Sequence, residues 1–231
     1  MDTSVKVASL PKEGRVLKPR SRVFSFRVKG PFACFTRLEA RAHKLSYDVM
    51  TPSAARGIAM AILWKPSIAW HIKRIHVLAP IQFRDPLLRN ELRTLYPKRE
   101  PYFASEDRTQ RMTTCLRDVD YVVECYFEMT DKAYPDDSVE KFTVMFERRL
   151  GKGQYFHPPY LGMREFMAAV SPVDETTPPP LPAYREIPIP LGRMLLEPGP
   201  DGPITFEAEL DGGTLVEKGK DSLPAFSFSG A

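Results

Sequence analysis

The strictest pattern in this chain is an alternation of apolar side chains near its middle. The alternating positions are Val119, Tyr121, Val123, Cys125, Phe127 and Met129. Between them lie residues that include Asp120, Glu124 and Glu128. Successive side chains of a β-strand point to opposite faces of a sheet, so residues 119–129 are predicted to form a strand with one apolar face.

Two helices are predicted on either side of this strand, because apolar side chains recur there at helical spacing. The first begins at Thr51-Pro52, where threonine can cap the helix and proline suits its first turn. It should end before Pro66. The second helix is capped by Ser138 and should stop at Gly151.

Three further strands complete the main pattern. One covers residues 23–28 and should stop at the turn dipeptide Gly30-Pro31. Residues 68–83 also alternate, with a slip at Lys73-Arg74 that a hairpin turn or a β-bulge would produce. Residues 164–170 are expected to form a closing strand. The resulting order, βαββαβ, is that of a ferredoxin-like or RNA-recognition-like α+β sheet.

The remaining segments divide the chain into regions. Residues 1–21 are expected to be a flexible basic tail, and residues 22–170 the ferredoxin-like domain. Within it, residues 84–117 hold eight basic residues and three prolines and are expected to be an inserted basic arm. Residues 171–231, with ten prolines between positions 172 and 203, should be a Pro-rich linker and a small β-sheet appendage.

The charge is unevenly distributed along the chain. Residues 1–30 contain eight Lys or Arg and two Asp or Glu, residues 31–170 contain 21 and 17, and residues 171–231 contain four and ten. A basic front favours a polyanion as partner, because clustered cations gain by releasing phosphate counterions. A solvated charged surface remains the alternative.

Several classes of protein are not expected. No segment approaches the roughly 18 apolar residues that cross a bilayer, and the N-terminus has no apolar leader, so we expect a cytoplasmic protein with no membrane partner. Cys34, Cys115 and Cys125 form no CxxC pair and are expected to be buried free thiols. No phosphate-binding loop, metal-ligand spacing or nucleophile elbow occurs, so no metal and no cofactor is predicted.

Several segments together resemble one known family. They are Gly30–Arg37, Leu45–Ile58, Trp64–Pro66, Pro80–Ile81, Arg89–Glu91, Arg108–Arg111, Leu116–Tyr121 and Pro159–Phe166. Over roughly residues 22–210 the chain resembles the type I-C CRISPR-associated RAMP proteins, the d subtype of the Cas five family. The resemblance implies a ferredoxin-like fold with a small C-terminal β region.

The same resemblance implies a function in prokaryotic antiviral defence. Members bind the repeat-derived 5′ handle of CRISPR RNA (crRNA) at one end of the Cascade surveillance complex, beside its backbone and large subunits. Target DNA near the PAM is a further contact that the resemblance suggests. In this subtype members usually also process the precursor RNA as metal-independent endoribonucleases.

The cutting members of this family have Tyr or His directly before Trp-Lys-Pro and a Lys-His pair early in the second helix. The matching positions here are Leu63, Lys141 and Phe142, so only the lysine agrees. RNA cleavage needs a base, a cation and an acid, and leucine and phenylalanine supply none of these. Lys141 is therefore the first catalytic candidate, and His157 and His43 are candidate replacements for the missing groups.

Other residues are candidates for RNA binding, with structural roles as the alternative. They are Tyr47, Arg56, Lys65, Arg89, Arg93, Arg108 and Arg111. The resemblance places the guide-contacting thumb of the family in the arm, which favours phosphate contacts for its arginines. Two functions stay open at this point. One is an endoribonuclease that cuts precursor RNA, and the other is a catalytically inactive subunit that binds the handle.

Overall fold

The computed structural model describes residues 18–40, 43–84, 86–92, 103, 105, 108–179, 184, 186–199 and 201–224. Within them the chain forms strands and helices in the order β1 (Phe24–Ala33), β2 (Lys44–Leu45), α1 (Pro52–Ile62), β3 (Ile68–Val77), β4 (Leu87–Leu92), β5 (Arg108–Thr114), β6 (Leu116–Met129), α2 (Val139–Gly151), β7 (Ala169–Pro172), β8 (Ile189–Gly199), β9 (Gly202–Asp211) and β10 (Thr214–Glu217).

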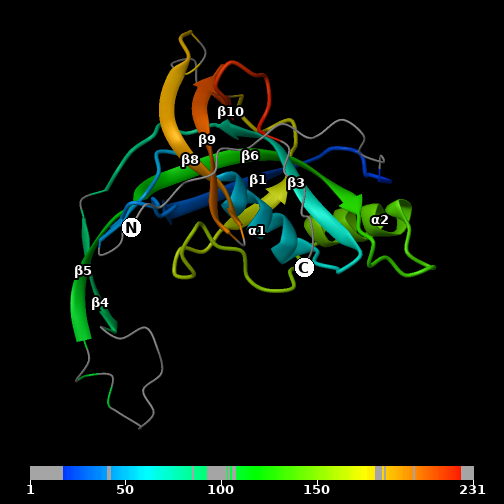
Figure 1. Ribbon diagram of the computed structural model, residues 1–231, viewed down its shortest axis with the longest axis horizontal. Coiled ribbons are helices and arrows are strands. Elements are labelled where there is room, and N and C mark those ends of the chain that lie inside the picture. Colours follow the sequence, from blue (N-terminus) through cyan, green and yellow to red (C-terminus); the bar gives the residue numbers. More distant parts are fainter. Residues whose placement is uncertain are drawn as a thin grey trace.

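Most strands belong to one antiparallel sheet with the order β7-β1-β6-β3-β10-β9-β8. A second sheet, β2-β5-β4, extends from one end of the first and forms the arm (Figure 1). The chain passes directly from one sheet to the other, because only Cys115 separates the end of β5 from the start of β6. The arm and α2 consequently lie at opposite ends of the molecule (Figure 1).

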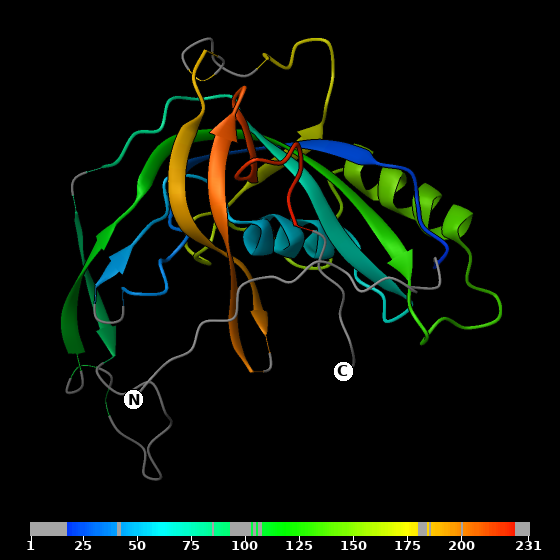
Figure 2. The same cartoon turned by 45° about the horizontal axis from the view of Figure 1, so that its top comes forward.

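Both helices bury their apolar faces in one hydrophobic core. Ile58 and Ile62 of α1 join Phe142 and Phe146 of α2 in a cluster with the inward side chains of β6, such as Phe127. The large sheet arches over α1, and β8 and β9 cross in front of this helix (Figure 2). The exposed ends and outer faces of the helices are therefore the surfaces that the sheet leaves open.

The structure confirms the strand at residues 119–129 and both helices, whose caps are Thr51 and Ser138 as predicted. The slip in the alternation of residues 68–83 is a β-bulge between Ile72 and Arg74, and β3 ends at Val77. These features were predictable because alternation and capping depend on residues close together in the chain.

The predicted end of the strand over residues 68–83 is wrong, because β3 ends at Val77, and two further strand boundaries were also predicted wrongly. β1 continues through Gly30 to Ala33, because Phe32 and Ala33 still pair with β6. Gly30 permits this path, since a Cβ atom there would lie 2.3 Å from Leu161 Cδ1. The closing strand β7 covers Ala169–Pro172, later than predicted, because the preceding residues form a turn closed by the hydrogen bond from Phe166 N–H to the Met163 carbonyl.

The strands after residue 188 continue the large sheet through the pairing of β10 with β3. Their buried side chains, including Met194, Phe206 and Leu215, belong to the same core cluster as the helices. Cys34, Cys115 and Cys125 are buried free thiols, as predicted. In the described part of the chain, neither helix is long and apolar enough to cross a membrane.

Candidate functional site

The first turn of α2 presents Lys141 to solvent. Ser138 caps this helix, and its side chain accepts a hydrogen bond from the Lys141 N–H at 3.2 Å. The helix then turns Phe142, Phe146 and Leu150 into the core, a spacing that defines one helical face. Lys141 precedes this buried face, and its side chain is 47% exposed.

Asp137 connects Lys141 to the loop that follows α1. Lys141 Nζ lies 3.0 Å from Asp137 Oδ1 and donates a longer hydrogen bond, 3.4 Å, to the carbonyl of Asp136. The second carboxylate oxygen of Asp137 accepts a hydrogen bond from Ser67 Oγ at 2.5 Å. The hydrogen bonds from Ser67 and then Lys141 lower the pKa of Asp137, so its carboxylate is charged at neutral pH.

The loop after α1 is also tied directly to the segment before α2. Thr130 Oγ1 donates to the carbonyl of Pro66 at 2.6 Å, and the Thr130 N–H donates to the carbonyl of Ser67 at 2.9 Å. Trp64, at the start of this loop, is about half exposed. The end of α1 and the start of α2 therefore form one continuous surface, which we call the helix site (residues 64–67, 137 and 141).

Leu63 and Phe142 occupy the two positions where the resemblance implies catalytic side chains. Both lie in the hydrophobic core, with 0% and 1% of their surface exposed. The carbonyl of Leu63 accepts a hydrogen bond from Trp70 Nε1 at 2.8 Å, which fixes the end of α1. Neither side chain reaches the surface, so Lys141 is the single titratable group at the three matched positions.

Aromatic and basic groups gather around the end of α1. The Phe156 N–H donates to the carbonyl of Ala61 at 2.7 Å, and the Phe156 ring is 71% exposed. Arg149 Nη1 donates to the carbonyl of Ile62 at 3.0 Å. Together with Trp64, these contacts bring two exposed rings and a guanidinium to one end of the helix. Exposed rings of this kind can stack on the bases of single-stranded RNA.

His157 lies beside a different part of α1. It lines a hollow of about 260 Å³ together with the cap residue Thr51 and with residues of the first half of that helix, among them Ser53. Its ring stacks on Tyr160, with 6.3 Å between the ring centroids. Lys141 does not line this hollow. His157 and Lys141 therefore belong to two distinct surface regions.

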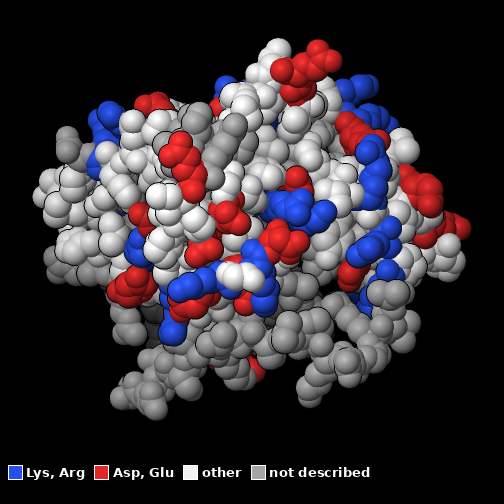
Figure 3. Space-filling model, turned by 90° about the horizontal axis from the view of Figure 1, so that it is seen from above, with Lys and Arg blue, Asp and Glu red and all other residues white. Residues whose placement is uncertain are grey.

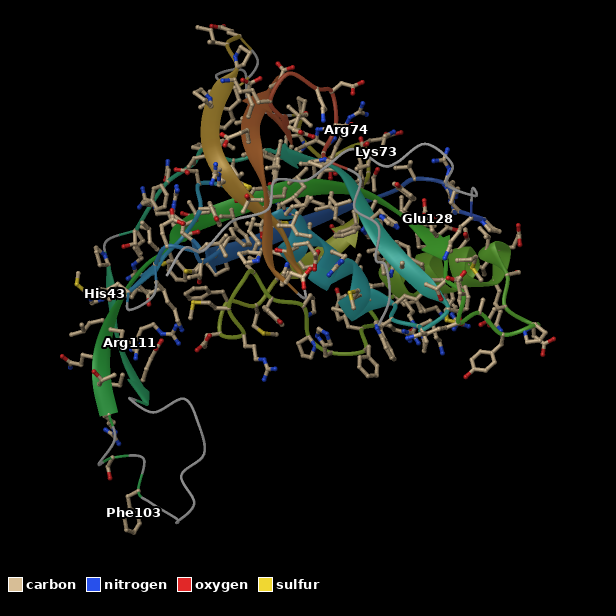
Figure 4. All side chains as sticks on the ribbon, viewed as in Figure 1. His43, Lys73, Arg74, Phe103, Arg111 and Glu128 are labelled. Carbon is tan, nitrogen blue, oxygen red and sulfur yellow. The ribbon has the colours of Figure 1, made fainter. Side chains whose placement is uncertain are left out.

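His43 belongs to the arm. Its Nδ1 accepts a hydrogen bond from the backbone N–H of Met112 in β5 at 3.3 Å. Figure 4 shows His43 and Arg111 together on the arm, away from the helices. The structure thus distributes the three catalytic candidates over the helix site, the hollow beside α1 and the arm.

The basic side chains of the arm converge on an acidic one. Glu91 lies 2.8 Å from Lys44, 3.7 Å from Arg111 and 4.0 Å from Arg89, measured between nitrogen and carboxylate oxygen. Arg89 also forms an ion pair with Glu165, from the loop after α2. Arg108 begins β5 and is exposed. Arg93, the remaining predicted arm residue, lies outside the described residues.

The other predicted RNA-binding residues have varied surroundings. Tyr47 is 1% exposed, with the guanidinium of Arg37 5.0 Å from its ring centroid. Arg56 forms an ion pair with Glu197 of β8, where burial lowers the pKa of Arg56 and raises that of Glu197 to about 7. Lys65 is partly exposed in the helix site. Of these three, Lys65 is the one that belongs to the same loop as Trp64 and Ser67.

The acidic partners of the cations were missed by the sequence analysis. Asp137 stands four residues before Lys141, a spacing that brings side chains together on a helix and could have signalled the pair. Glu165 and Glu197 carry no such signal, because the contacts of Glu165 with Arg89 and of Glu197 with Arg56 join distant parts of the chain. Among the residues that the structure describes, no group of three or more His, Cys, Asp or Glu could hold a metal ion.

Comparison with known proteins identifies the class of this fold. A crystal structure of a CRISPR-associated protein superimposes with a TM-score of 0.65, covering 88% of this chain and 95% of the other at 24% identity. The chain thus has the architecture of a solved CRISPR-associated protein, a mixed α/β fold with one large antiparallel sheet and two helices.

The sequence comparisons define the family. The family model of the CRISPR-associated protein Cas5d matches residues 23–226. A CRISPR pre-crRNA endoribonuclease Cas5d from Mannheimia succiniciproducens is 42% identical over 205 residues, 80% of this chain and 90% of that protein. A protein of the same name from Thermus thermophilus is 44% identical over 152 residues, 66% of this chain and 65% of that protein. The chain belongs to the Cas5d family, which confirms the resemblance seen in its sequence.

Proposed function

We propose that this protein is a CRISPR pre-crRNA endoribonuclease that cuts the repeat and keeps the 5′ handle of the product. The names of the relatives from Mannheimia succiniciproducens and Thermus thermophilus support this activity. The observation that carries the proposal is Lys141, a half-exposed cation whose partner Asp137 also bonds Ser67, in the loop that contains the exposed Trp64 and the partly exposed Lys65. Such a surface can hold single-stranded RNA by stacking and by neutralising phosphates.

The proposed reaction needs no external nucleophile. The 2′-hydroxyl attacks the adjacent phosphorus atom and loses its proton, and the 5′-oxygen of the next nucleotide leaves with a proton. The products are a 2′,3′-cyclic phosphate and a 5′-hydroxyl. Lys141 would stabilise the charge that develops on the phosphorane, because its ammonium group points to solvent where a phosphate can reach it. His157 and His43 remain predictions as partners in the proton transfers.

We also propose that the arm contacts the RNA backbone within a surveillance complex that contains further subunits. Arg108 and Arg111 on β5 and Arg89 on β4 support this proposal through their partial exposure. The strand order β7-β1-β6-β3, with a helix after β1 and another after β6, supports a ferredoxin-like arrangement of the main domain. An RNA-processing protein of this kind would act in the cytoplasm.

The C-terminal region is proposed to depend on the main domain for its stability. Residues 171–231 contribute Met194, Phe206 and Leu215 to the core that both helices share. Removing the main domain would expose these side chains to water. This packing supports the proposal that residues 171–231, a Pro-rich linker and a small β appendage, do not fold without the main domain.

A second function is favoured by one specific observation. Leu63 and Phe142 are core residues, so the matched catalytic positions other than Lys141 carry no group able to transfer a proton. A chain with this substitution pattern could bind the handle without cutting it. The second candidate function is therefore a catalytically inactive, handle-binding subunit.

Incubation of the purified protein with its cognate repeat RNA in excess chelator distinguishes the two functions. The endoribonuclease should give one cleavage product that ends in a 2′,3′-cyclic phosphate, and the protein should remain bound to the handle fragment. Tight binding without cleavage, over hours and at several protein concentrations, would support the inactive subunit. A repeat of scrambled sequence serves as the control for specificity.

A further inference from the structure

We propose that Asp137 is a positioning residue that holds the ammonium group of Lys141 beside the loop after α1. The inference rests on the proposed function and adds a residue that the match with the family's catalytic positions does not include. Asp137 lies in the loop before α2, and its side chain is 9% exposed although Lys141 is 47% exposed. The carboxylate is thus a largely buried anchor for a surface-exposed lysine.

The carboxylate of Asp137 is held by more than the lysine. Its Oδ2 accepts hydrogen bonds from Ser67 Oγ at 2.5 Å and from the Tyr134 N–H at 3.2 Å. Ser67 is 2% exposed, so little water competes for this contact. Because Oδ2 is occupied by these two donors, Oδ1 is the oxygen that faces Lys141. The carboxylate therefore has one defined orientation.

The donors of Lys141 are arranged to leave one free for a ligand. An ammonium group has three N–H donors. One points to Asp137 Oδ1 at 3.0 Å and a second makes the longer contact to the carbonyl of Asp136. Within the described part of the chain the third donor has no hydrogen-bond acceptor, and the Phe142 ring centroid lies 5.7 Å from Nζ, so this donor can be given to a phosphate oxygen. Holding a lysine in one orientation before RNA binds removes part of the entropy cost of placing its charge at the reacting phosphate.

The contact also fixes Lys141 relative to the surface that would bind RNA. Ser67 belongs to the same loop as Trp64 and Lys65, and that loop is joined to the α2 side by both hydrogen bonds of Thr130. Asp137 is the link in this network that reaches the catalytic candidate. Without its carboxylate, the backbone of the loop would stay in place while the ammonium group would lose its anchor.

The test compares Asp137→Asn with Asp136→Asn in single-turnover cleavage of saturating repeat RNA. Asp136→Asn is the matched control, because it removes the same charge one residue away while leaving the backbone carbonyl that contacts Lys141. We expect Asp137→Asn to slow cleavage by roughly 10- to 100-fold, because a group misplaced by about 1 Å can cost on the order of 100-fold, with the Kd for RNA nearly unchanged. Asp136→Asn should cut at nearly the wild-type rate. Equal rates for wild type and Asp137→Asn would overturn the proposal.

A double-mutant cycle separates positioning from a general structural role. In a Lys141→Ala background, Asp137→Asn should cause no further loss of cleavage, because the group that Asp137 positions is already absent. Additive losses would mean that Asp137 acts independently of Lys141 and would refute the proposal. If Asp137→Asn lowers the thermal midpoint, Asp137→Glu, which keeps the charge, should recover part of the cleavage rate as well as the stability.

A chemical measurement tests the contact even in a protein that does not cut RNA. The intact protein is treated with an acylating reagent, and the rate at which Lys141 becomes acylated is followed by mass spectrometry. Loss of the carboxylate should speed labelling about twofold to threefold, the scale of an exposed ion pair, whereas Asp136→Asn should not. Unchanged labelling refutes the positioning role. If the wild type does not cut RNA but labelling is faster in Asp137→Asn, the endoribonuclease activity is refuted and the contact between Asp137 and Lys141 is supported.

Discussion

The arm and the helix site both contain basic residues, but these residues pair with acidic side chains in different arrangements. In the arm, three cations surround Glu91, and one of them also contacts Glu165. In the helix site, Lys141 pairs with Asp137 and remains half exposed. The arm therefore shares its carboxylates among several partly buried cations, whereas the helix site presents one paired but half-exposed lysine to a ligand.

This difference shows why a count of basic residues does not measure the field at a surface. The face in Figure 3 has basic and acidic side chains lying side by side over much of its area. Paired cations in such an arrangement attract RNA less strongly than the same cations alone, because the neighbouring carboxylates cancel part of their potential. RNA affinity should depend on the sum of these charges, whereas the rate of cleavage should depend on the position of one charge, that of Lys141.

The largest effect is expected at the helix site. Lys141→Ala should slow cleavage of the repeat RNA by on the order of 100-fold, the scale of losing one group that stabilises transition-state charge. The Kd for the handle should change little, since a single exposed cation is removed. Single-turnover rates and a binding titration measure both quantities. Lys220→Ala, an exposed lysine paired with Glu217 near β10, is the control and should cut normally.

The arm should behave in the opposite way. Replacing Arg108 and Arg111 together by alanine should weaken RNA binding about tenfold at moderate salt and lower the slope of log affinity against log salt by about 1.4, at roughly 0.7 per phosphate contact. Filter binding at four salt concentrations measures this slope. Arg193→Ala with Lys220→Ala removes two paired cations elsewhere and should leave the slope unchanged. An unaffected slope in the arm variant would contradict RNA contact by β5.

A smaller effect, of opposite sign, is expected when the acidic centre of the arm is neutralised. Glu91→Gln leaves Lys44, Arg89 and Arg111 without their shared carboxylate. RNA binding should tighten about threefold at low salt, and the salt dependence should become steeper. Glu207→Gln, which removes an exposed acid paired with Arg193, is the control. Weaker RNA binding by Glu91→Gln would contradict this prediction. It would show that Glu91 mainly holds the conformation of the arm and that its effect on the positive potential is secondary.

The last effect is on folding stability and concerns the buried pair of Arg56 and Glu197. Burial raises the pKa of Glu197 from an ordinary value of 4.5 to about 7, against the opposing effect of Arg56. Between about pH 5 and pH 7 the folded protein therefore keeps a proton that the unfolded chain has released. The free energy of unfolding should fall as the pH rises through this range, by about 1 kcal/mol or more. Urea denaturation of the wild type and Glu197→Gln measures this. The free energy of unfolding of Glu197→Gln should not show this fall with pH. If wild type and variant depend on pH in the same way, Glu197 is charged over the whole range from about pH 5 to 7.

The elements of the main sheet were largely predictable, and those of the arm were not. The alternation that revealed β6 reflects a core on one side and polar surroundings on the other. In the arm, Leu88 and Met112 are exposed while Arg89 and Arg111 turn inward toward Glu91, so the hydrophobic pattern carries no signal for β4 and β5. These strands form because they pair with each other and with β2, which depends on backbone hydrogen bonds more than on burial.

The sequence by itself determined the family, the order of the main strands and helices and their caps, and it singled out Lys141 as the one position that agrees with the residues implied by the resemblance. These features depend on motifs and on residues within a few positions of one another, where hydrogen bonding and hydrophobic periodicity act locally. Tertiary structure alone decided that Ser67 would meet Asp137 and that Arg56 would meet Glu197. Such contacts join side chains 70 and 141 residues apart in the chain, and they form only where the packing of helices against the sheet brings both partners within a few ångströms.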